Sequence, residues 1–418
     1  MDNMKRGKFK ICIISIFVII FAILCVFMSN LFFNNSKISK NSNVLQDLNI
    51  ATNNIISNNG INNTIVDNSI NEISAEINDD LFSNYYAEAD SILENMSIED
   101  KVGQMFLARF PDDNVVNEIK EENPGGYILF AKDFKNESKD SIKSKLSSYQ
   151  EYSDIPLIFG VDEEGGTVVR VSSYTAFRSS PFKSPKDVYS SSGMDGVLAD
   201  SHEKSVLLKS IGINMNLAPV VDLPSSSSDF IYKRSFSTDL NLTTEFTRNI
   251  INMMNEDNII SCMKHFPGYG NNVDTHTGIS FDKREYSNFL TRDFVPFEEG
   301  IKNSAPTILV SHNIVSCMDK DFPASLSKNV HDILRNDLNF SGLIITDDLA
   351  MDAVKSYVTD NSAAIQAVLA GNDMIISSDF KKQKDAVINA INNNIISINL
   401  INTAVRRILA CKIAYDII

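Results

Sequence analysis

Eight short apolar runs constrain the fold of this chain of 418 residues more than any other feature of its sequence. Each run is almost continuously apolar and rich in β-branched residues, as expected for strands that are buried on both faces of a parallel sheet. The segments between the runs are long enough to hold crossover helices. The runs cover residues 104–108, 127–130, 157–161, 215–221, 260–265, 307–311, 343–346 and 374–377. This repetition predicts an α/β fold, a (β/α)8 TIM barrel that forms a single globular domain.

A doubly wound open sheet is the alternative that the same alternation allows. No GxGxxG fingerprint follows the first apolar run, which weakens a nucleotide-binding version of that fold. Asp and Glu outnumber Lys and Arg by 53 to 38, so the net charge of −15 argues against a general nucleic-acid binder. The five cysteines form no CxxC and no Cys/His cluster with zinc spacing, so we expect no metal and no cofactor. Cys262, Cys317 and Cys411 are expected to be buried free thiols.

The first 80 residues differ in composition from the rest of the chain. Residues 1–10 form a basic flank, and residues 11–33 form an apolar run of 23 residues without charge or proline. This run is long enough to span a bilayer as a helix and longer than the apolar segment of a typical cleaved signal peptide. Residues 34–80 contain fourteen asparagines and no aromatic residue, which is typical of a disordered tether.

These segments predict a single-pass transmembrane signal anchor. The positive flank would stay in the cytoplasm, so the globular domain of residues 81–418 would lie on the extracellular face of the cell membrane. A protein that is secreted after signal cleavage is the alternative.

Polar side chains stand where five of the apolar runs end. A helix cap or a structural hydrogen bond explains any one of them. In a barrel, however, the carboxyl ends of all strands meet at one face, where active sites lie, so five such positions together predict a site. The residues are Asp162, Asp222, Lys264 with His265, His312, and Asp347 with Asp348.

Two segments go beyond this pattern. Residues 264–278 read KHFPGYGNNVDTHTG and leave a strand through a glycine-rich turn that delivers Asp274 and His276. Residues 342–351 read GLIITDDLAM and place Asp347 at a strand end. In these segments the sequence resembles glycoside hydrolase family 3, specifically its bacterial β-N-acetylhexosaminidase branch (the NagZ type).

Four further motifs extend the resemblance to about residues 90–412, which is essentially the whole globular part. They are PGGYILF at 124–130, GVDEEGG at 160–166, KRSF at 233–236 and VRRIL at 405–409. The sequence departs from the family at Thr167, where relatives often have Arg, and at Tyr269, where many have His.

The resemblance implies a role for each matching residue. It makes Asp347 the catalytic nucleophile and His276 the general acid/base, with Asp274 as the partner of the histidine. It assigns the holding of a terminal N-acetylglucosamine to Asp162, Arg170, Arg234, Lys264 and His265.

Elementary chemistry agrees with these roles. A retaining glycosidase needs a carboxylate below the anomeric carbon and a proton donor beside the leaving oxygen. A carboxylate at a strand end suits the first role, and a histidine oriented by an aspartate two residues away suits the second. Asp348 is expected to cap the following segment or support its neighbour rather than react.

The resemblance therefore implies a retaining exo-β-N-acetylglucosaminidase without a cofactor. Its expected substrates are peptidoglycan-derived muropeptides, from which it would hydrolyse terminal β-linked N-acetylglucosamine through a covalent glycosyl-enzyme on Asp347. Two alternatives stay open. One is a β-N-acetylglucosaminide phosphorylase, because a neutral histidine repels phosphate less than a carboxylate does. The other is a non-catalytic cell-wall-binding protein on the same scaffold.

Overall fold

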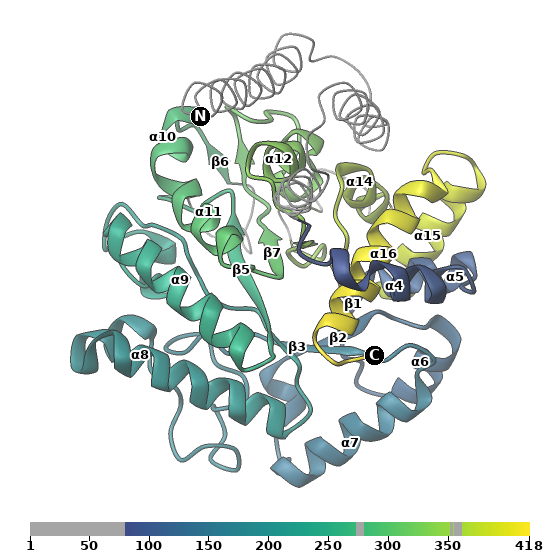
Figure 1. Cartoon of the computed structure of the whole chain (residues 1–418), viewed down its shortest axis with the longest axis horizontal. Helices are drawn as coiled ribbons and strands as arrows, with labels where there is room; N and C mark the ends of the chain where they lie inside the picture. The colour runs from purple at the N-terminus through teal and green to yellow at the C-terminus, as the bar shows by residue number, and fades with distance from the viewer. Residues whose placement is uncertain (1–79, 273–279, 352–353, 355–361) are drawn as a thin grey trace, which may run out of the picture. The chain divides into compact units, whose positions relative to one another are not determined.

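The eight apolar runs form the eight strands of one parallel barrel sheet (Figure 1). The computed structural model describes residues 80–272, 280–351, 354 and 362–418. The hydrogen-bonded strand order is β10-β1-β2-β3-β4-β5-β7-β9, and every paired neighbour is parallel. The strands are β1 (Phe106–Arg109), β2 (Gly126–Leu129), β3 (Ile158–Val161), β4 (Met215–Asn216), β5 (Ile260–Phe266), β7 (Thr307–Val310), β9 (Leu343–Thr346) and β10 (Ile375–Ser377). The predicted barrel of eight parallel strands is confirmed.

The seam between the two ends of this sheet is nearly closed. Ile345 of β9 forms a parallel bridge with Met374. The amide of Thr346 donates to the carbonyl of Met374 at 3.1 Å, and the amide of Met374 donates to the carbonyl of Ile344 at 3.1 Å. The last strand of the chain therefore fastens β9 to β1.

Helices follow the strands in turn and surround them (Figure 1). Those on the barrel wall are α6 (Val115–Glu122), α7 (Lys139–Tyr152), α8 (Pro185–Ser210), α9 (Leu240–Glu256), α10 (Tyr286–Asn288), α11 (Phe294–Lys302), α12 (Lys328–Asp332), α14 (Ala363–Ala370), α15 (Phe380–Asn392) and α16 (Ile398–Ala414). Two helices precede the first strand, α4 (Tyr86–Leu93) and α5 (Ile98–Gln104). Short 3-10 turns are η1 (Ser83–Tyr85), η2 (Ala131–Phe134), η3 (Phe230–Lys233) and η5 (Ala324–Leu326), and the π-helical turns are η4 (Phe289–Asp293) and η6 (Ile333–Asp337). A separate two-stranded sheet joins β6 (Phe281–Asp282) to β8 (Ile314–Val315).

Local sequence explains where several helices begin. Ser97 caps α5 by accepting from the amide of Asp100, whose carboxylate accepts from the amide of Ser97 in return, as a capping box requires. Ser184 caps α8, and Pro185 occupies the first turn, where its missing N–H costs nothing. Gly193 breaks the regular backbone of α8 with a φ of 66°.

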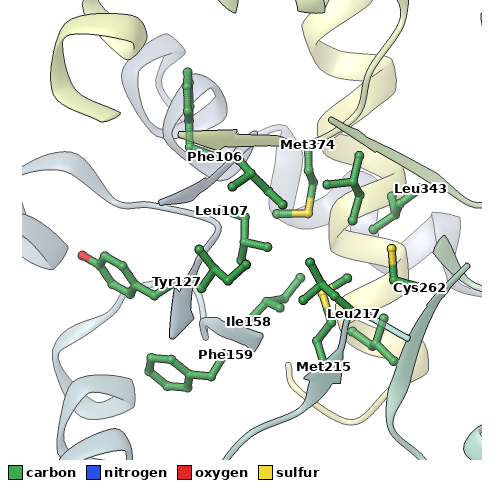
Figure 2. Packing of buried hydrophobic residues seen from close by; sticks show 14 of the residues in the cluster. Phe106, Leu107, Tyr127, Ile158, Phe159, Met215, Leu217, Cys262, Leu343 and Met374 are labelled. Atoms are coloured by element: carbon green, nitrogen blue, oxygen red, sulfur yellow. The ribbon is translucent and has the colours of Figure 1, made fainter. Parts of the chain in front are cut away.

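The apolar core fills the barrel and the layer between strands and helices (Figure 2). A Cβ at Gly160 would lie 3.1 to 3.8 Å from side-chain atoms of Leu217, Met215 and Leu107, so these side chains pack together against the glycine. Phe106 instead packs its ring against Phe380 of α15, with centroids 5.2 Å apart. Side chains buried on both faces of the strands explain why the runs are apolar without alternation.

Strand β4 is shorter than the sequence predicts. The run of residues 215–221 predicts one strand, whereas regular pairing stops at Asn216. Pro219 has no N–H to donate to a ladder, so the chain continues irregularly beside β5, with the amide of Val221 donating to the carbonyl of Lys264 at 2.9 Å. Among the thiols, Cys262 and Cys411 are buried as predicted, but Cys317 is exposed.

The predicted membrane localisation requires a correction. The basic flank at 1–10, the anchor at 11–33 and the tether up to residue 79 lie outside the described residues. Within the part that the structure describes, no helix is long and apolar enough to cross a bilayer. The prediction of a single-pass membrane protein with an extracellular domain is wrong on this finding, whereas the domain boundary at residue 81 stays a prediction.

Candidate active site

The polar residues predicted at strand ends gather at the carboxyl end of the barrel. Asp162 directly follows β3, Lys264 and His265 lie in the last part of β5, and Asp347 directly follows β9. This is the face on which barrel enzymes place their active sites.

Lys264 is the cation at the centre of this group. Its Nζ lies 2.6 Å from Oδ1 of Asp162 and 2.6 Å from Oε1 of Glu164. Its side chain is only 3% exposed. Burial works to lower the pKa of Lys264, but the charges of Asp162 and Glu164 outweigh burial and raise it. The ammonium therefore stays charged and keeps one N–H for another acceptor.

Arg234 reaches the same glutamate from the loop after β4. Its Nε and Nη2 donate to the two carboxylate oxygens of Glu164 at 3.0 and 2.7 Å. Burial works to raise the pKa of Glu164, yet the charges of Lys264 and Arg234 hold it well below its usual range. Glu164 is thus an ionised anion that two cations share. Its carboxylate holds the charged groups of both Arg234 and Lys264 in place.

His265 joins this network through a third contact of the arginine. Nη2 of Arg234 lies 3.1 Å from Nε2 of His265, and Nδ1 of His265 lies 2.7 Å from Oδ2 of Asp222. Asp222 also accepts from the backbone amides of His265 at 3.1 Å and Tyr269 at 2.7 Å. The ring of Tyr269 packs edge-on against His265 with a centroid distance of 5.4 Å, so the residue that departs from the family supports the imidazole.

Glu163 organises the loop that follows β3. Its buried carboxylate accepts from the amides of Arg170 at 2.7 Å, Val171 at 2.8 Å and Ser172 at 3.2 Å. The hydroxyl of Ser172 donates to it as well. This glutamate therefore holds the backbone of the loop on which Arg170 is carried.

Among the described residues, no hydrogen bond or ion pair joins the side chain of Arg170 to this network. Its Nη1 reaches only the carbonyl of Val169, at 3.4 Å, and its Cζ lies 6.0 Å from the ring centroid of Phe130. Its buried Nε has no hydrogen-bond partner within the described residues. The structure thus brings together Asp162, Arg234, Lys264 and His265 of the predicted set, but not Arg170.

Asp347 and Asp348 are both held by hydrogen bonds, and the carboxylate of Asp347 accepts from the amide of Asp348 at 2.8 Å. The amide of Asp347 donates to the carbonyl of Val310 at 3.1 Å. The carboxylate of Asp348 accepts from the amide of Ala350 at 2.9 Å and from the hydroxyl of Ser378 at 2.8 Å. Asp348 is thus used to stabilise the turn after β9, as its sequence position predicts.

His312, which lies just after β7, supports the same turn. Its Nε2 lies 3.0 Å from the carbonyl oxygen of Asp348, which can only accept, so this nitrogen donates. Its Nδ1 lies 2.6 Å from the hydroxyl of Ser325. The imidazole therefore fixes the backbone next to Asp347.

A buried thiol lies within electrostatic reach of two of the carboxylates. Burial raises the pKa of Cys262 to about 12, and the negative charges of Asp162 and Asp347 act in the same direction. The thiol therefore stays protonated near neutral pH and is unsuited to act as a nucleophile.

Asp274 and His276 lie outside the described residues, but the chain on both sides of them is well fixed. Arg284 donates to Asp282 at 2.7 Å, to Asp293 at 2.8 Å and to the carbonyl of Gly268 at 2.9 Å. Asn272 donates to Asp282 at 2.6 Å. The two stems of the segment are thus joined through one carboxylate.

The described residues offer polyol chemistry rather than a metal site. No group of three or more His, Cys, Asp or Glu in the described part is arranged to hold a metal ion. Arg234 keeps both N–H groups of Nη1, and Asp162 keeps one carboxylate oxygen, after the contacts above are counted. Donors and an acceptor side by side in a buried wall suit the hydroxyl groups of a sugar.

Sequence reasoning singled out most of this network but not all of it. Glu163 and Glu164 were visible only as part of a motif, and Asp222 only as a polar strand end. Arg234 and Glu164 are 70 positions apart, so no local pattern pairs them.

Comparison with known proteins places this chain in a family. The model of the glycosyl hydrolase family 3 N-terminal domain matches residues 97–411. The chain is similar to a protein of Nitrosomonas eutropha named "Beta-hexosaminidase", with 28% identity over 272 residues that cover 64% of this chain and 77% of that one. A protein of the same name from Psychromonas ingrahamii is 31% identical over 263 residues, covering 60% and 74%.

Solved structures agree with the sequence comparisons. The fold is similar to that of a glycoside hydrolase family 3 β-N-acetylglucosaminidase from Paenibacillus, with a TM-score of 0.72 and 25% identity. That alignment covers 77% of this chain but only 63% of the Paenibacillus protein, so this chain spans less than two thirds of it. The chain therefore belongs to glycoside hydrolase family 3 and is an enzyme of the glycoside hydrolase class, as its sequence motifs predict.

Proposed function

We propose that this protein is a retaining exo-β-N-acetylglucosaminidase that hydrolyses terminal β-linked N-acetylglucosamine. The observation that carries the proposal is the network of Asp162, Glu164, Arg234 and Lys264 at the carboxyl end of the barrel, the end at which Asp347 follows β9. It supports a terminal sugar held by fixed hydrogen-bond donors, with a carboxylate within the same face of the barrel.

The names of the relatives support the same substrate class. The curated relatives are named β-hexosaminidases, and the Paenibacillus structure is named a β-N-acetylglucosaminidase. Among glycans that contain this sugar, we propose muropeptides derived from peptidoglycan as the natural substrate.

In the proposed mechanism, a carboxylate oxygen of Asp347 attacks the anomeric carbon and forms a glycosyl ester. The bond from that carbon to the leaving oxygen breaks as His276 gives this oxygen a proton. In the second step His276 takes a proton from water, the water oxygen attacks the anomeric carbon, and Asp347 leaves as a carboxylate. Two inversions retain the β configuration.

The described residues have two parts in this mechanism. Arg234, Lys264 and Asp162 bind hydroxyl groups of the terminal sugar, which fixes its anomeric carbon relative to Asp347. His312 and Asp348 hold the turn after β9, so the nucleophile does not have to be ordered when substrate binds.

Asp274 is proposed to orient His276 and to stabilise its protonated form. Arg170 is proposed as a further residue that holds the sugar, and its Nε has no hydrogen-bond partner among the described residues.

The test is the release of 4-nitrophenol and of sugar from 4-nitrophenyl β-N-acetylglucosaminide, with and without inorganic phosphate. We expect phosphate-independent release of free N-acetylglucosamine that is first formed as the β anomer and is abolished by Asp347→Ala. The same protein should release N-acetylglucosamine from a purified disaccharide-peptide of peptidoglycan.

Other results would replace the proposal. A phosphate-dependent reaction that yields a sugar 1-phosphate would make the protein a phosphorylase. Binding of wall fragments without any release would make it a non-catalytic wall-binding protein. A first product in the α configuration would remove Asp347 from the role of nucleophile.

A further inference from the structure

We infer that Asp222 is a positioning residue that fixes the tautomer of His265 and, through it, the orientation of Arg234. The inference rests on the proposed function, because it assigns to Arg234 a role in holding the sugar. Asp222 reaches the guanidinium of Arg234 through the imidazole of His265, which lies between them.

The first step of the argument concerns the contact between Arg234 and His265. Nη2 of Arg234 lies 3.1 Å from Nε2 of His265. A guanidinium has only donors, so Nε2 must carry a lone pair rather than a proton. One N–H of Nη2 is already used on Glu164 at 2.7 Å, and the second is the one that the imidazole accepts.

The second step concerns the other ring nitrogen. If Nε2 is bare, the proton of a neutral imidazole is on Nδ1, which lies 2.7 Å from Oδ2 of Asp222. A carboxylate can only accept, so it selects the protonated Nδ1. Asp222 and Arg234 thus require the same tautomer from opposite sides of the ring.

The third step concerns the contacts that hold the carboxylate of Asp222 in place. Its side chain is 0% exposed. Besides the imidazole it accepts from the amide of His265 at 3.1 Å and from the amide of Tyr269 at 2.7 Å. An asparagine has one acceptor oxygen and one donor nitrogen, so it cannot satisfy the imidazole and both amides together.

The consequence for substrate binding follows from the arginine. With Nε and Nη2 fixed by Glu164 and His265, the two N–H groups of Nη1 are left in a defined direction. A proton on Nε2 would point at Nη2 and push the guanidinium away from this position. Asp222 therefore affects sugar binding indirectly, because it orients His265 and His265 orients Arg234. Carboxylates that hydrogen-bond to a functional histidine act in the same way in other proteins.

The direct test is the tautomer itself, measured by 15N NMR on the full chain labelled at its five histidines. The signal of His265 is identified by its loss in His265→Gln. We expect the wild-type imidazole to be protonated on Nδ1 and the Asp222→Asn variant to be protonated on Nε2. A wild-type His265 protonated on Nε2 overturns the inference without any need for the variant to fold.

Steady-state kinetics are the second test of this role of Asp222. In Asp222→Asn we expect kcat/KM on 4-nitrophenyl β-N-acetylglucosaminide to fall about 10- to 100-fold, mostly through KM, which corresponds to one hydrogen bond with a charged group. In the His265→Gln background, an amide oxygen can accept from Arg234 whichever residue stands at position 222. The effect of Asp222→Asn should then fall below about 3-fold, and an equal effect in both backgrounds would indicate a merely structural role.

Asp373→Asn is the matched control, because Asp373 is another buried aspartate whose carboxylate accepts from two arginines and one amide. It precedes β10 and so lies at the amino ends of the strands, away from the site. It should lower stability without a change in KM. If the wild-type protein releases no sugar from any β-N-acetylglucosaminide, the proposed function fails, while the tautomer measurement still decides the role of Asp222.

Discussion

Lys412 and Gln104 meet in the interior of the protein, where Nζ of the lysine donates to Oε1 of the glutamine at 2.6 Å. Both side chains are fully buried. Gln104 ends α5, immediately before the barrel begins, and its Nε2 donates to the carbonyls of Asn123 at 3.1 Å and Pro124 at 3.2 Å. No carboxylate pairs with Lys412 in the described part of the chain, so burial lowers the pKa of this lysine from 10.5 to about 7.

This lysine should make stability depend on pH. Between pH 7 and pH 10.5 the unfolded chain holds a proton on Lys412 that the folded chain has lost, so stability should rise with pH by about 1.4 kcal/mol per unit from this group. Below pH 7 both states are protonated, and its contribution is constant and at its least favourable. Lys412→Met should remove this slope, as urea unfolding at pH 6, 7, 8 and 9 can measure.

Lys384→Met is the matched control for that experiment. Lys384 is also buried, but its Nζ donates to the carbonyl of Glu122 at 2.8 Å and to the carboxylate of the same residue at 2.9 Å. Its removal should lower stability at every pH in the series. If Lys412→Met kept the wild-type slope, the interpretation of Lys412 would be wrong.

Arg234 should matter for substrate more than for the fold. Arg234→Ala should lower kcat/KM by a factor that corresponds to roughly 1.5–3 kcal/mol, the range for a hydrogen bond to a charged group. Glu164 keeps Lys264 as a partner at 2.6 Å, so the variant should still fold. Arg178→Ala is the control, since Arg178 makes the same two-bond contact with Glu203 at 2.9 and 3.1 Å on the surface. Wild-type kinetics in Arg234→Ala would refute the binding role.

Substitutions of the two adjacent aspartates, Asp347 and Asp348, should have clearly different effects on activity. Asp347→Asn should abolish turnover of every substrate, because an amide cannot form the glycosyl ester. Asp348→Asn should retain turnover within about 10-fold and lower stability by about 1 kcal/mol, since Asp348 accepts from Ala350 and Ser378. Thermal unfolding and single-turnover assays on both variants check this, and the opposite ranking would exchange their roles.

His276 should show its role through the leaving group. In His276→Ala, a 4-nitrophenyl glycoside needs little protonation, so a burst of phenol should precede a slow steady state. A natural disaccharide should lose about 10²- to 10⁴-fold in the first step itself. Mass spectrometry should find the glycosyl-enzyme accumulated on Asp347. Equal losses for both substrates without a burst would exclude His276 as the acid/base.

Asp373 should be a stability residue. It accepts from Arg335 at 2.5 Å, from Arg407 at 3.0 Å and from the amide of Ile344 at 2.9 Å, so it joins α16, η6 and β9. Asp373→Asn leaves two arginines without their buried anion, and we expect a loss of about 3–5 kcal/mol in unfolding experiments. Activity per folded molecule should stay at the wild-type level, and a fall in kcat with an unchanged midpoint would contradict this.

The strands were predictable because a strand that is buried on both faces is a continuous apolar run in the sequence. The exception, β4, shows the limit of that reasoning, since composition favours a strand through residue 221 while Pro219 lacks the N–H that regular pairing needs. The site was predictable only in part. Asp162, Lys264 and the other strand ends lie on one face because parallel topology puts them there.

The partners of those residues depend on tertiary structure that no local pattern reports. Glu164 meets Arg234 across 70 positions, and Asp222 meets His265 across 43. Arg170 was assigned by motif, and among the described residues its backbone amide donates to Glu163 while its guanidinium forms no hydrogen bond with the network. The assignments of Asp274 and His276 stay predictions.

The seam of the barrel has a consequence for the order in which the turn at Asp347 is completed during synthesis. The turn that bears Asp347 is bonded to β7 through the carbonyl of Val310 and to β10 through the carbonyl of Ile376, which accepts from the amide of Leu349 at 3.1 Å. β10 follows β9 in the sequence, so it leaves the ribosome after the turn that bears Asp347. A nascent chain that extends only to residue 373 lacks the partner of β9 at this seam, next to Asp347. The turn that bears Asp347 therefore receives its full set of backbone bonds only after β10 has been synthesised.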